Sequence, residues 1–401
     1  MAQTILDFIA RVEPNKSAHL DALLAQIASN VPENSLIPFA KLPSLHFSSL
    51  VVFESSGFGP YLVWEHNFDG ELNAYLDELL HNAAGLDQIL SCCVGYSPAH
   101  PRNYILSHIV RPNTYHIGTV GRGVDRIRRE ANLRHQIEVF LDSKDFSGQS
   151  AEAVQAEIQR FVGQQPALAW AKHVEPRLTT KERILPYINI ALAVLIALPF
   201  VPLLLIGLLL LRWHELRDKP RTELVASAHV RQLFETENFA AQNHLASITI
   251  VKPGLLRKMT LKFVLFAANL AARTSTSGQL SGIPTIHFAH WSVIDGGKRL
   301  LFLSNYGGSW GSYLDDFIDK ASPGLTGIWT NTVGFPKTRF LVLEGSRDGP
   351  GFKNFARSSQ SVTRVWYSAY TNLTVPNINS NSAFREGLYG SVDAKEWLRL
   401  L

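Results

Sequence analysis

The sequence predicts an α+β fold in which two similar units flank one membrane-embedded helical segment. A six-residue pattern that keeps Pro, His and Phe in place occurs twice, at 42–47 and at 283–288. A stretch without any charged residue separates the two copies, at 184–211. Of the 401 residues, 46% are hydrophobic and 18% are charged, which is the composition of a folded chain.

The two copies remain aligned beyond this pattern, with one inserted residue, Pro323, in the second. Agreement over such a length, with Gly and Tyr among the matches, is hard to obtain from shared periodicity alone, so it indicates an internal duplication. The matched pairs include Leu62 with Leu300, Asn67 with Asn305, Gly70 with Gly308, Tyr75 with Tyr313 and Asp77 with Asp315.

Bulk properties argue against several classes of protein. The net charge of +4 is spread along the chain without a dense basic tract, so nucleic acid is not an expected partner. Cys92 and Cys93 are adjacent in an expected strand and would point to opposite faces, which argues against a disulfide or a zinc site. The N-terminus lacks the basic and apolar regions of a signal peptide, so we expect the chain to begin in the cytoplasm.

We expect residues 1–40 to form a helical segment and residues 41–145 to form the first unit. A helical connector follows at 146–183, where Ser150 is positioned to cap a helix. Apolar runs and apolar periodicity predict, within the first unit, strands at 45–53, 61–65 and 88–94 and helices at 71–83 and 124–141.

The segment at 184–213 is predicted to enter a membrane. It exceeds the roughly 20 apolar residues that span a bilayer as a helix. Pro199 and Pro202 interrupt it, and because each removes a backbone donor, the helix is expected to kink or reverse there.

Basic residues at both ends of this segment predict that both ends face the cytoplasm. Two units that pack on each other also need to lie on the same side. We therefore favour a re-entrant hairpin that turns at Pro199 to Pro202, with arms of roughly 15 and 9 residues that are too short for two full spans. A single kinked span is the alternative. The flanking basic residues are Lys181, Arg183, Arg212, Arg217, Lys219 and Arg221.

A second helical connector is expected at 214–280. Its stretch 254–270 combines basic and bulky apolar residues, which is typical of an interfacial helix on a lipid surface or of a helix packed on the protein's own core. The second unit, 281–401, is predicted to repeat the first. Its expected strands are 286–294, 300–304, 327–333, 339–343 and 363–370, and its expected helices are 310–321 and 351–359.

This order of elements resembles the ferredoxin-like fold of dimeric α+β barrel proteins. In that family two such sheets face each other and enclose a cavity. The resemblance implies that the two units form a pseudo-dimeric barrel, with a site between them.

The two recurring histidines are the sharpest candidates for chemistry. Strict alternation would place Leu45 and Phe47 on one strand face and His46 on the other, and the same holds around His287. Two imidazoles that converge between the sheets could ligate haem iron or another metal, or move protons near neutral pH. The alternative is that each histidine caps a strand or hydrogen-bonds a neighbouring carbonyl.

Three further side chains are candidates for polar contacts. Asn67 and Asn305 end the second strands, where asparagine makes a turn and caps a helix or contacts a cavity mouth. Arg122 lies in a glycine-rich run, 118–124, that could hold a phosphate or a haem propionate at a helix N-terminus, or could be a tight turn before a basic helix. The candidate cofactor-binding residues are thus His46, His287, Arg122 and Asn305.

Residues 345–349 match the GxxDG pattern of dye-decolourising haem peroxidases, which also use duplicated ferredoxin-like domains. This resemblance implies haem as the cofactor and gives Asp348 the acid–base role in peroxide cleavage. It assigns neither the distal arginine nor the proximal histidine, and we take His287 as the candidate iron ligand and His46 as a further catalytic candidate.

Two functions follow as hypotheses. The first is a membrane-associated, haem-peroxidase-like oxidoreductase that acts on a hydrophobic or lipid-derived substrate, with both units facing the cytoplasm. The alternative is a non-catalytic, membrane-anchored lipid-binding or scaffold protein. Expected partners are the lipid bilayer and a hydrophobic small molecule, and the oligomeric state stays open. The chain contains no HExxH or GxSxG pattern to favour a zinc enzyme or a hydrolase.

Overall fold

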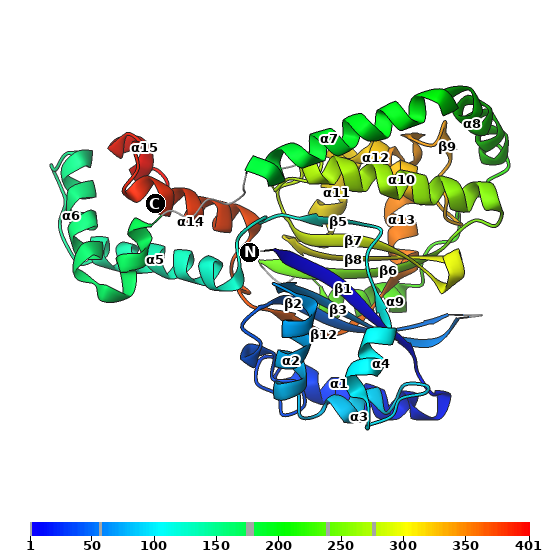
Figure 1. Cartoon of the computed structure of the whole chain (residues 1–401), viewed down its shortest axis with the longest axis horizontal. Coiled ribbons are helices and arrows are strands. Elements are labelled where there is room, and N and C mark those ends of the chain that lie inside the picture. Colours follow the sequence, from blue (N-terminus) through cyan, green and yellow to red (C-terminus); the bar gives the residue numbers. More distant parts are fainter. Residues whose placement is uncertain (1, 56–57, 174–179, 238–240, 275–277) are drawn as a thin grey trace.

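The protein is a mixed α and β structure whose two antiparallel sheets lie face to face with helices on their outer sides (Figure 1). The computed structural model describes residues 2–55, 58–173, 180–237, 241–274 and 278–401. The α+β class predicted from the sequence is confirmed at this level.

The first sheet has the strand order β12-β2-β3-β1-β4. Its outer face packs on helices through a core that includes Phe8, Leu24, Trp64 and Leu79. The strands are β1 (Gln3–Arg11), β2 (Leu45–Ser55), β3 (Phe58–Asp69), β4 (Ile109–Val110) and β12 (Thr363–Ser368), and the helices are η1 (Pro14–Lys16), α1 (Ser17–Ser29), η2 (Phe39–Lys41), α2 (Leu72–Asn82), α3 (Leu86–Leu90) and α4 (Pro101–Ser107).

The second sheet has the order β11-β6-β8-β7-β5. Its outer face also packs on helices, through a core that includes Leu265, Trp291 and Phe317. The strands are β5 (Thr114–Ile117), β6 (Gln242–Ile250), β7 (Ile286–Ile294), β8 (Arg299–Gly307) and β11 (Gln360–Ser361), and the helices are α9 (Ser227–Thr236), α10 (Leu255–Thr274), η5 (Asp295–Gly297), α11 (Trp310–Lys320), α12 (Ser322–Trp329), η6 (Gly345–Arg347) and α13 (Gly349–Ser359), with a small hairpin of β9 (Thr338–Arg339) and β10 (Leu343–Glu344).

The two sheets exchange their edge strands. The chain passes from β4 at the edge of the first sheet to β5 at the edge of the second, and later returns from β11 in the second sheet to β12 in the first. Each sheet is therefore completed by hydrogen bonds to a strand from the other half, which ties the halves together.

The remaining helices form two groups. A side bundle packs around Leu133, Ile158 and Trp397 and lies away from the sheets (Figure 1). It consists of α5 (Val124–Asp142), α6 (Ala151–Gln164), η3 (Pro166–Lys172), α14 (Val375–Leu388) and α15 (Ala394–Leu398).

The second group is the apolar segment, formed by α7 (Thr180–Ala197), η4 (Leu198–Phe200) and α8 (Val201–Glu215). Within the described residues, one helix, Ile184–Glu215, is long and apolar enough to cross a membrane. The chain changes direction around η4, where Pro199 lies (Figure 1). α7 contains 18 residues and α8 contains 15, and both counts include charged residues that lie outside the expected apolar arms of roughly 15 and 9 residues. The side chain of Arg183 lies outside the described residues.

Several expected elements are wrong. The segments expected as strands at 88–94 and 327–333 begin inside the helices α3 and α12, because a short apolar run does not distinguish a buried strand from a buried helix. The N-terminal segment expected to be helical begins with β1, and the connector expected to be helical contains β6. Both strands are buried on both faces and therefore lack the alternation that marks a half-exposed strand.

Candidate site between the two sheets

The two recurring histidines both occupy β-bulges. The register of β2 against β3 shifts between Leu45 and Phe47, and that of β7 against β8 shifts between Ile286 and Phe288. A bulge inserts one residue and breaks the alternation of the strand. Leu45 therefore packs toward the helices while Phe47 lies between the sheets, so the expectation that they share a face is wrong.

The bulges bring both histidines into one buried aromatic cluster. The ring centroid of His46 lies 5.2 Å from that of Phe288, and the ring centroid of His287 lies 5.2 Å from that of Phe47. Tyr370 contacts both imidazoles, at centroid distances of 5.8 Å and 6.1 Å. Both histidine side chains are completely buried.

His46 is fully hydrogen-bonded. Its Nδ1 lies 2.8 Å from the hydroxyl of Tyr370, and its Nε2 lies 3.0 Å from Oδ1 of Asp69. The other carboxylate oxygen of Asp69 accepts a hydrogen bond from the backbone N–H of Val124, at the start of α5. The imidazole thus links β2 to the exchanged C-terminal segment and, through Asp69, to the side bundle.

His287 has no such partners. Neither of its ring nitrogens makes a hydrogen bond to the described residues. Burial, reinforced by the nearby His46, lowers the pKa of His287 to about 3, so its imidazole is neutral. Gly307 occupies the register position in β8 that Asp69 occupies in β3, which removes the carboxylate that would have held the ring.

A layer of charged side chains crosses the middle of the interface. His290 lies 2.9 Å and 3.0 Å from the two carboxylate oxygens of Asp7. His244 lies 3.1 Å from Glu65, and the hydroxyl of Ser49 donates to the same Glu65 oxygen at 3.0 Å. All four ionisable side chains are at most 5% exposed. Their contacts connect β1 and β3 of one sheet to β6 and β7 of the other.

Two members of the network, Glu65 and His290, have pKa values that are shifted toward their charged forms. Burial alone would raise the pKa of Glu65, but the hydrogen bond and charge of His244, together with the charge of His290, lower it to about 2. Burial lowers the pKa of His290, but the charge and hydrogen bond of Asp7 outweigh it, and the net shift is upward. Two carboxylates therefore face two imidazoles between the sheets.

The predicted asparagines lie in strands. Asn305 donates to Glu65 Oε1 at 3.0 Å and accepts from the indole N–H of Trp366 at 2.8 Å. It does not cap the following helix, whose N-cap is Ser309, so that expectation is wrong. Asn67 occupies the corresponding position of β3 and is completely buried.

Arg122 and Asp348 do not join the histidines. Arg122 is buried beside the side bundle, where its guanidinium donates to Asn379 at 2.5 Å. Asp348 is exposed on the outer, helical side of the second sheet, where its side chain accepts from the N–H of Gly351 at 3.1 Å and caps α13. The second sheet thus separates Asp348 from His46 and His287.

These residues do not fit a haem. Both ring nitrogens of His46 are occupied, and the His287 ring packs against Phe47 and Tyr370, where an iron ligand would need room for the macrocycle. Apolar side chains, including Val63 and Leu301 at one end and Ile5 and Ile117 at the other, fill the interface on either side of the charged layer. In the described parts of the chain, no group of three or more His, Cys, Asp or Glu side chains is arranged to hold a metal ion.

The sequence did not predict the charged layer. Asp7 was assigned to a helical segment and His244 to a helical connector, and Glu65 was not singled out. The available signal was a single charged residue in the middle of an apolar strand, as in Ile5 to Ile9, because such a charge is buried only with a partner.

No known family model, curated protein or solved structure matches this chain.

Proposed function

We propose that the protein is a membrane-anchored, non-catalytic lipid-binding or scaffold protein that attaches to the bilayer through α7 and α8. The exposed apolar surface of this segment carries the proposal. Leu195, Leu203 and Leu209 are 62%, 65% and 66% exposed, and most of the large apolar side chains between 184 and 210 are similarly uncovered. Apolar surface of this extent on a folded protein marks contact with a membrane or a partner.

The ends of the segment support anchoring with both sheets on the same side of the membrane. Glu215, at the end of α8, accepts hydrogen bonds from the hydroxyl of Thr338 and from the backbone N–H groups of Phe340 and Leu341. In the other arm, α7 packs along α10 (Figure 1). Both arms therefore rest on the half that contains the second sheet.

Residues near the end of α8 fit a membrane–water interface. Trp213 is 53% exposed, and the guanidinium of Arg217 lies 3.6 Å from the centroid of its indole. Trp and Arg at a helix end are typical of the interfacial region, with the basic residue on the cytoplasmic side. This supports a cytoplasmic location for the sheets.

The two halves are, in this proposal, copies of one ferredoxin-like unit. The order β1-α1-β2-β3-α2 recurs as β6-α10-β7-β8-α11, and the two copies share the bulge at His46 and His287. The exchange of edge strands is also the same in both sheets, because each sheet has an edge strand that comes from the other half.

The peroxidase-like oxidoreductase stays a prediction with less geometric support, because Asp348 lies apart from the histidines and the interface is filled. An absorption spectrum of the purified protein with and without added haemin tests it. A Soret band that His287→Ala removes and His46→Ala retains would restore that hypothesis.

The anchor is tested by flotation with phosphatidylcholine–phosphatidylglycerol vesicles. The double variant Leu195→Lys with Leu203→Lys is expected to leave the vesicle fraction, because two charges on the apolar segment oppose insertion. The matched control is Val139→Lys, which changes a side chain on α5 that is 52% exposed but distant from the segment, and it is expected to float like the unchanged protein. Equal flotation of both variants would contradict the anchor.

The same-side arrangement is tested by cysteine labelling in sealed vesicles. Asp77→Cys on α2 and Asp315→Cys on α11 place exposed thiols in the two halves, while Cys92 and Cys93 are buried and react slowly. Labelling of both sites from the same side is expected. Labelling from opposite sides would establish a single span and overturn the one-sided anchor.

A further inference from the structure

A cavity of about 460 Å³ lies between the β5–β7 edge of the second sheet, the C-terminal half of α10 and the start of α12. Its helical wall is made of small side chains, among them Ala268, Ala272, Ala321 and Gly324. A volume of this size is in the range of small-molecule sites.

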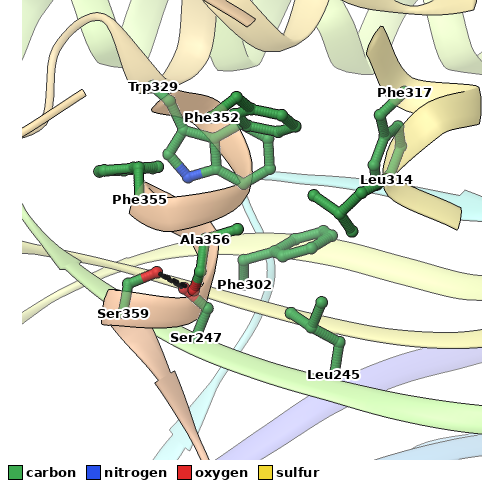
Figure 2. A pocket seen from close by; sticks show the side chains of 10 residues that line it. All are labelled: Leu245, Ser247, Phe302, Leu314, Phe317, Trp329, Phe352, Phe355, Ala356 and Ser359. Atoms are coloured by element: carbon green, nitrogen blue, oxygen red, sulfur yellow. Dashed lines mark hydrogen bonds between the residues drawn. The ribbon is translucent and has the colours of Figure 1, made fainter. Parts of the chain in front are cut away.

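The hollow differs from the packing elsewhere under the same sheet. Beneath α13, a cavity of only about 20 Å³ remains. Figure 2 shows the rings of Phe302, Trp329, Phe352 and Phe355 among the side chains that line it. The larger cavity is therefore a local consequence of the alanines and glycines in its wall.

Two buried polar atoms in the lining have no hydrogen-bond partner in the part of the chain that the structure describes. The Nε2 of His116 and the indole Nε1 of Trp291 make no hydrogen bond to any described residue, although the two side chains are 2% and 3% exposed. Thr114 pairs with Trp291 in the β5–β7 register, so His116 is the diagonal neighbour of Trp291 on the same sheet face. A buried donor or acceptor without a partner costs free energy that a ligand could recover.

The two atoms have complementary roles. Burial, then the charge of Arg273, lowers the pKa of His116 to about 4, so the imidazole is neutral. In the tautomer that carries its proton on Nδ1, the ring offers Nε2 as an acceptor, while Trp291 Nε1–H is a donor.

We propose that this cavity binds an apolar molecule that carries one hydroxyl group, such as a long-chain alcohol. A hydroxyl donates to His116 and accepts from Trp291, and the alanine wall accommodates the chain. Because α10 also packs along α7, delivery of the ligand from the bilayer rests on the proposed membrane anchor, whereas binding itself does not.

The test is equilibrium dialysis of the full-length protein in detergent against radiolabelled 1-decanol, with decanoate and decane as chain-matched competitors. Saturable binding of one decanol, displaced by neither competitor at equal concentration, is expected. Competition by decanoate as strong as that by unlabelled decanol would overturn the hydroxyl assignment, and no saturable binding would overturn the site.

Two variants locate the site. Gly324→Phe adds a phenyl ring at a glycine that lines the cavity and has open space around an added Cβ, and it is expected to abolish saturable binding. The matched control is Gly311→Phe, at a helical glycine with equally open space outside the cavity, and it is expected to bind normally. Trp291→Phe keeps an aromatic ring but loses the donor, and about tenfold weaker binding is expected.

Vesicle flotation of the same variants separates the two proposals. Gly324→Phe that floats normally without binding decanol supports both. If the unchanged protein floats but does not bind decanol, the proposed site is wrong and the proposed anchor stands. If it binds decanol but does not float, the proposed anchor is wrong and the proposed site stands.

Discussion

The two halves of the molecule place different chemistry at the same positions of the sheet interface. The first half supplies the carboxylates and the second half supplies the imidazoles. At each of these positions, the corresponding residue of the other half is uncharged. In register, Asp7 corresponds to Ala246, Glu65 to Leu303 and Ser49 to His290. Two copies of the first half would bury carboxylates without a counter-charge, so the halves are complementary in charge and not interchangeable.

The bulged histidines differ in the same way. His46 has both Tyr370 and Asp69 as partners, whereas His287 has Gly307 at the position of Asp69 and no hydrogen-bond partner among the described residues. The bulge and its aromatic surroundings are common to both halves, but the hydrogen bonds are not. The bulge and the aromatic cluster, which both halves share, therefore serve the fold, whereas the hydrogen bonds, which differ, decide how much each histidine contributes to stability.

The largest effect is expected at Glu65. Glu65→Leu introduces the residue found at the corresponding position 303, and it removes the partner of His244, Ser49 and Asn305. We expect a loss of about 3–5 kcal/mol in the free energy of unfolding, because buried charges are left unpaired. Urea denaturation in detergent micelles, followed by tryptophan fluorescence, measures it.

The control for this prediction is Asp125→Asn. Asp125 forms an exposed ion pair with Arg129, and its loss is expected to cost less than about 0.5 kcal/mol. In the double variant Glu65→Leu with His244→Leu, part of the loss is expected to return. Wild-type stability of Glu65→Leu alone would refute the role of the charged layer.

A smaller and opposite pair of effects is expected at the two histidines. His46→Leu leaves Asp69 and the Tyr370 hydroxyl without their partner, and we expect a loss of about 2 kcal/mol at neutral pH. His287→Leu removes two unpartnered buried nitrogens, and we expect a gain of up to about 1 kcal/mol. Thermal unfolding of both variants measures the contrast, and a destabilisation of equal size in both would contradict it.

The fold class and the long apolar segment could be predicted from the sequence because they rest on local signals. The apolar period of α5 and the uncharged stretch at 184–211 need no knowledge of the partner surfaces. β1 and β6 were missed because their alternation is hidden when both faces are buried. The bulges were missed because strict alternation was assumed through His46 and His287.

Only part of the site could be predicted. Recurrence identified His46 and His287, and the structure brings them together. Their partners come from distant segments, such as Tyr370 near the C-terminus, so which imidazole is held and which is free depends on tertiary contacts. Asp348 matched a short pattern that a helix cap also satisfies.

The last prediction uses the lowered pKa of His287. The folded pKa of about 3 lies below the unfolded value of 6.5, so between these values the unfolded chain binds a proton that the folded protein does not. Stability therefore falls as the pH drops below 6.5, by about 2 kcal/mol at pH 5 for this group. His66 and His116, whose pKa values are lowered to about 3 and about 4, act in the same direction.

In His287→Leu the pH dependence of the free energy of unfolding between pH 6 and 4.5 is expected to weaken by the contribution of one proton, while the contributions of the other two histidines persist. Urea denaturation across this range measures the slope, and a slope equal to that of the unchanged protein would mean that the pKa of His287 is not lowered in the folded state.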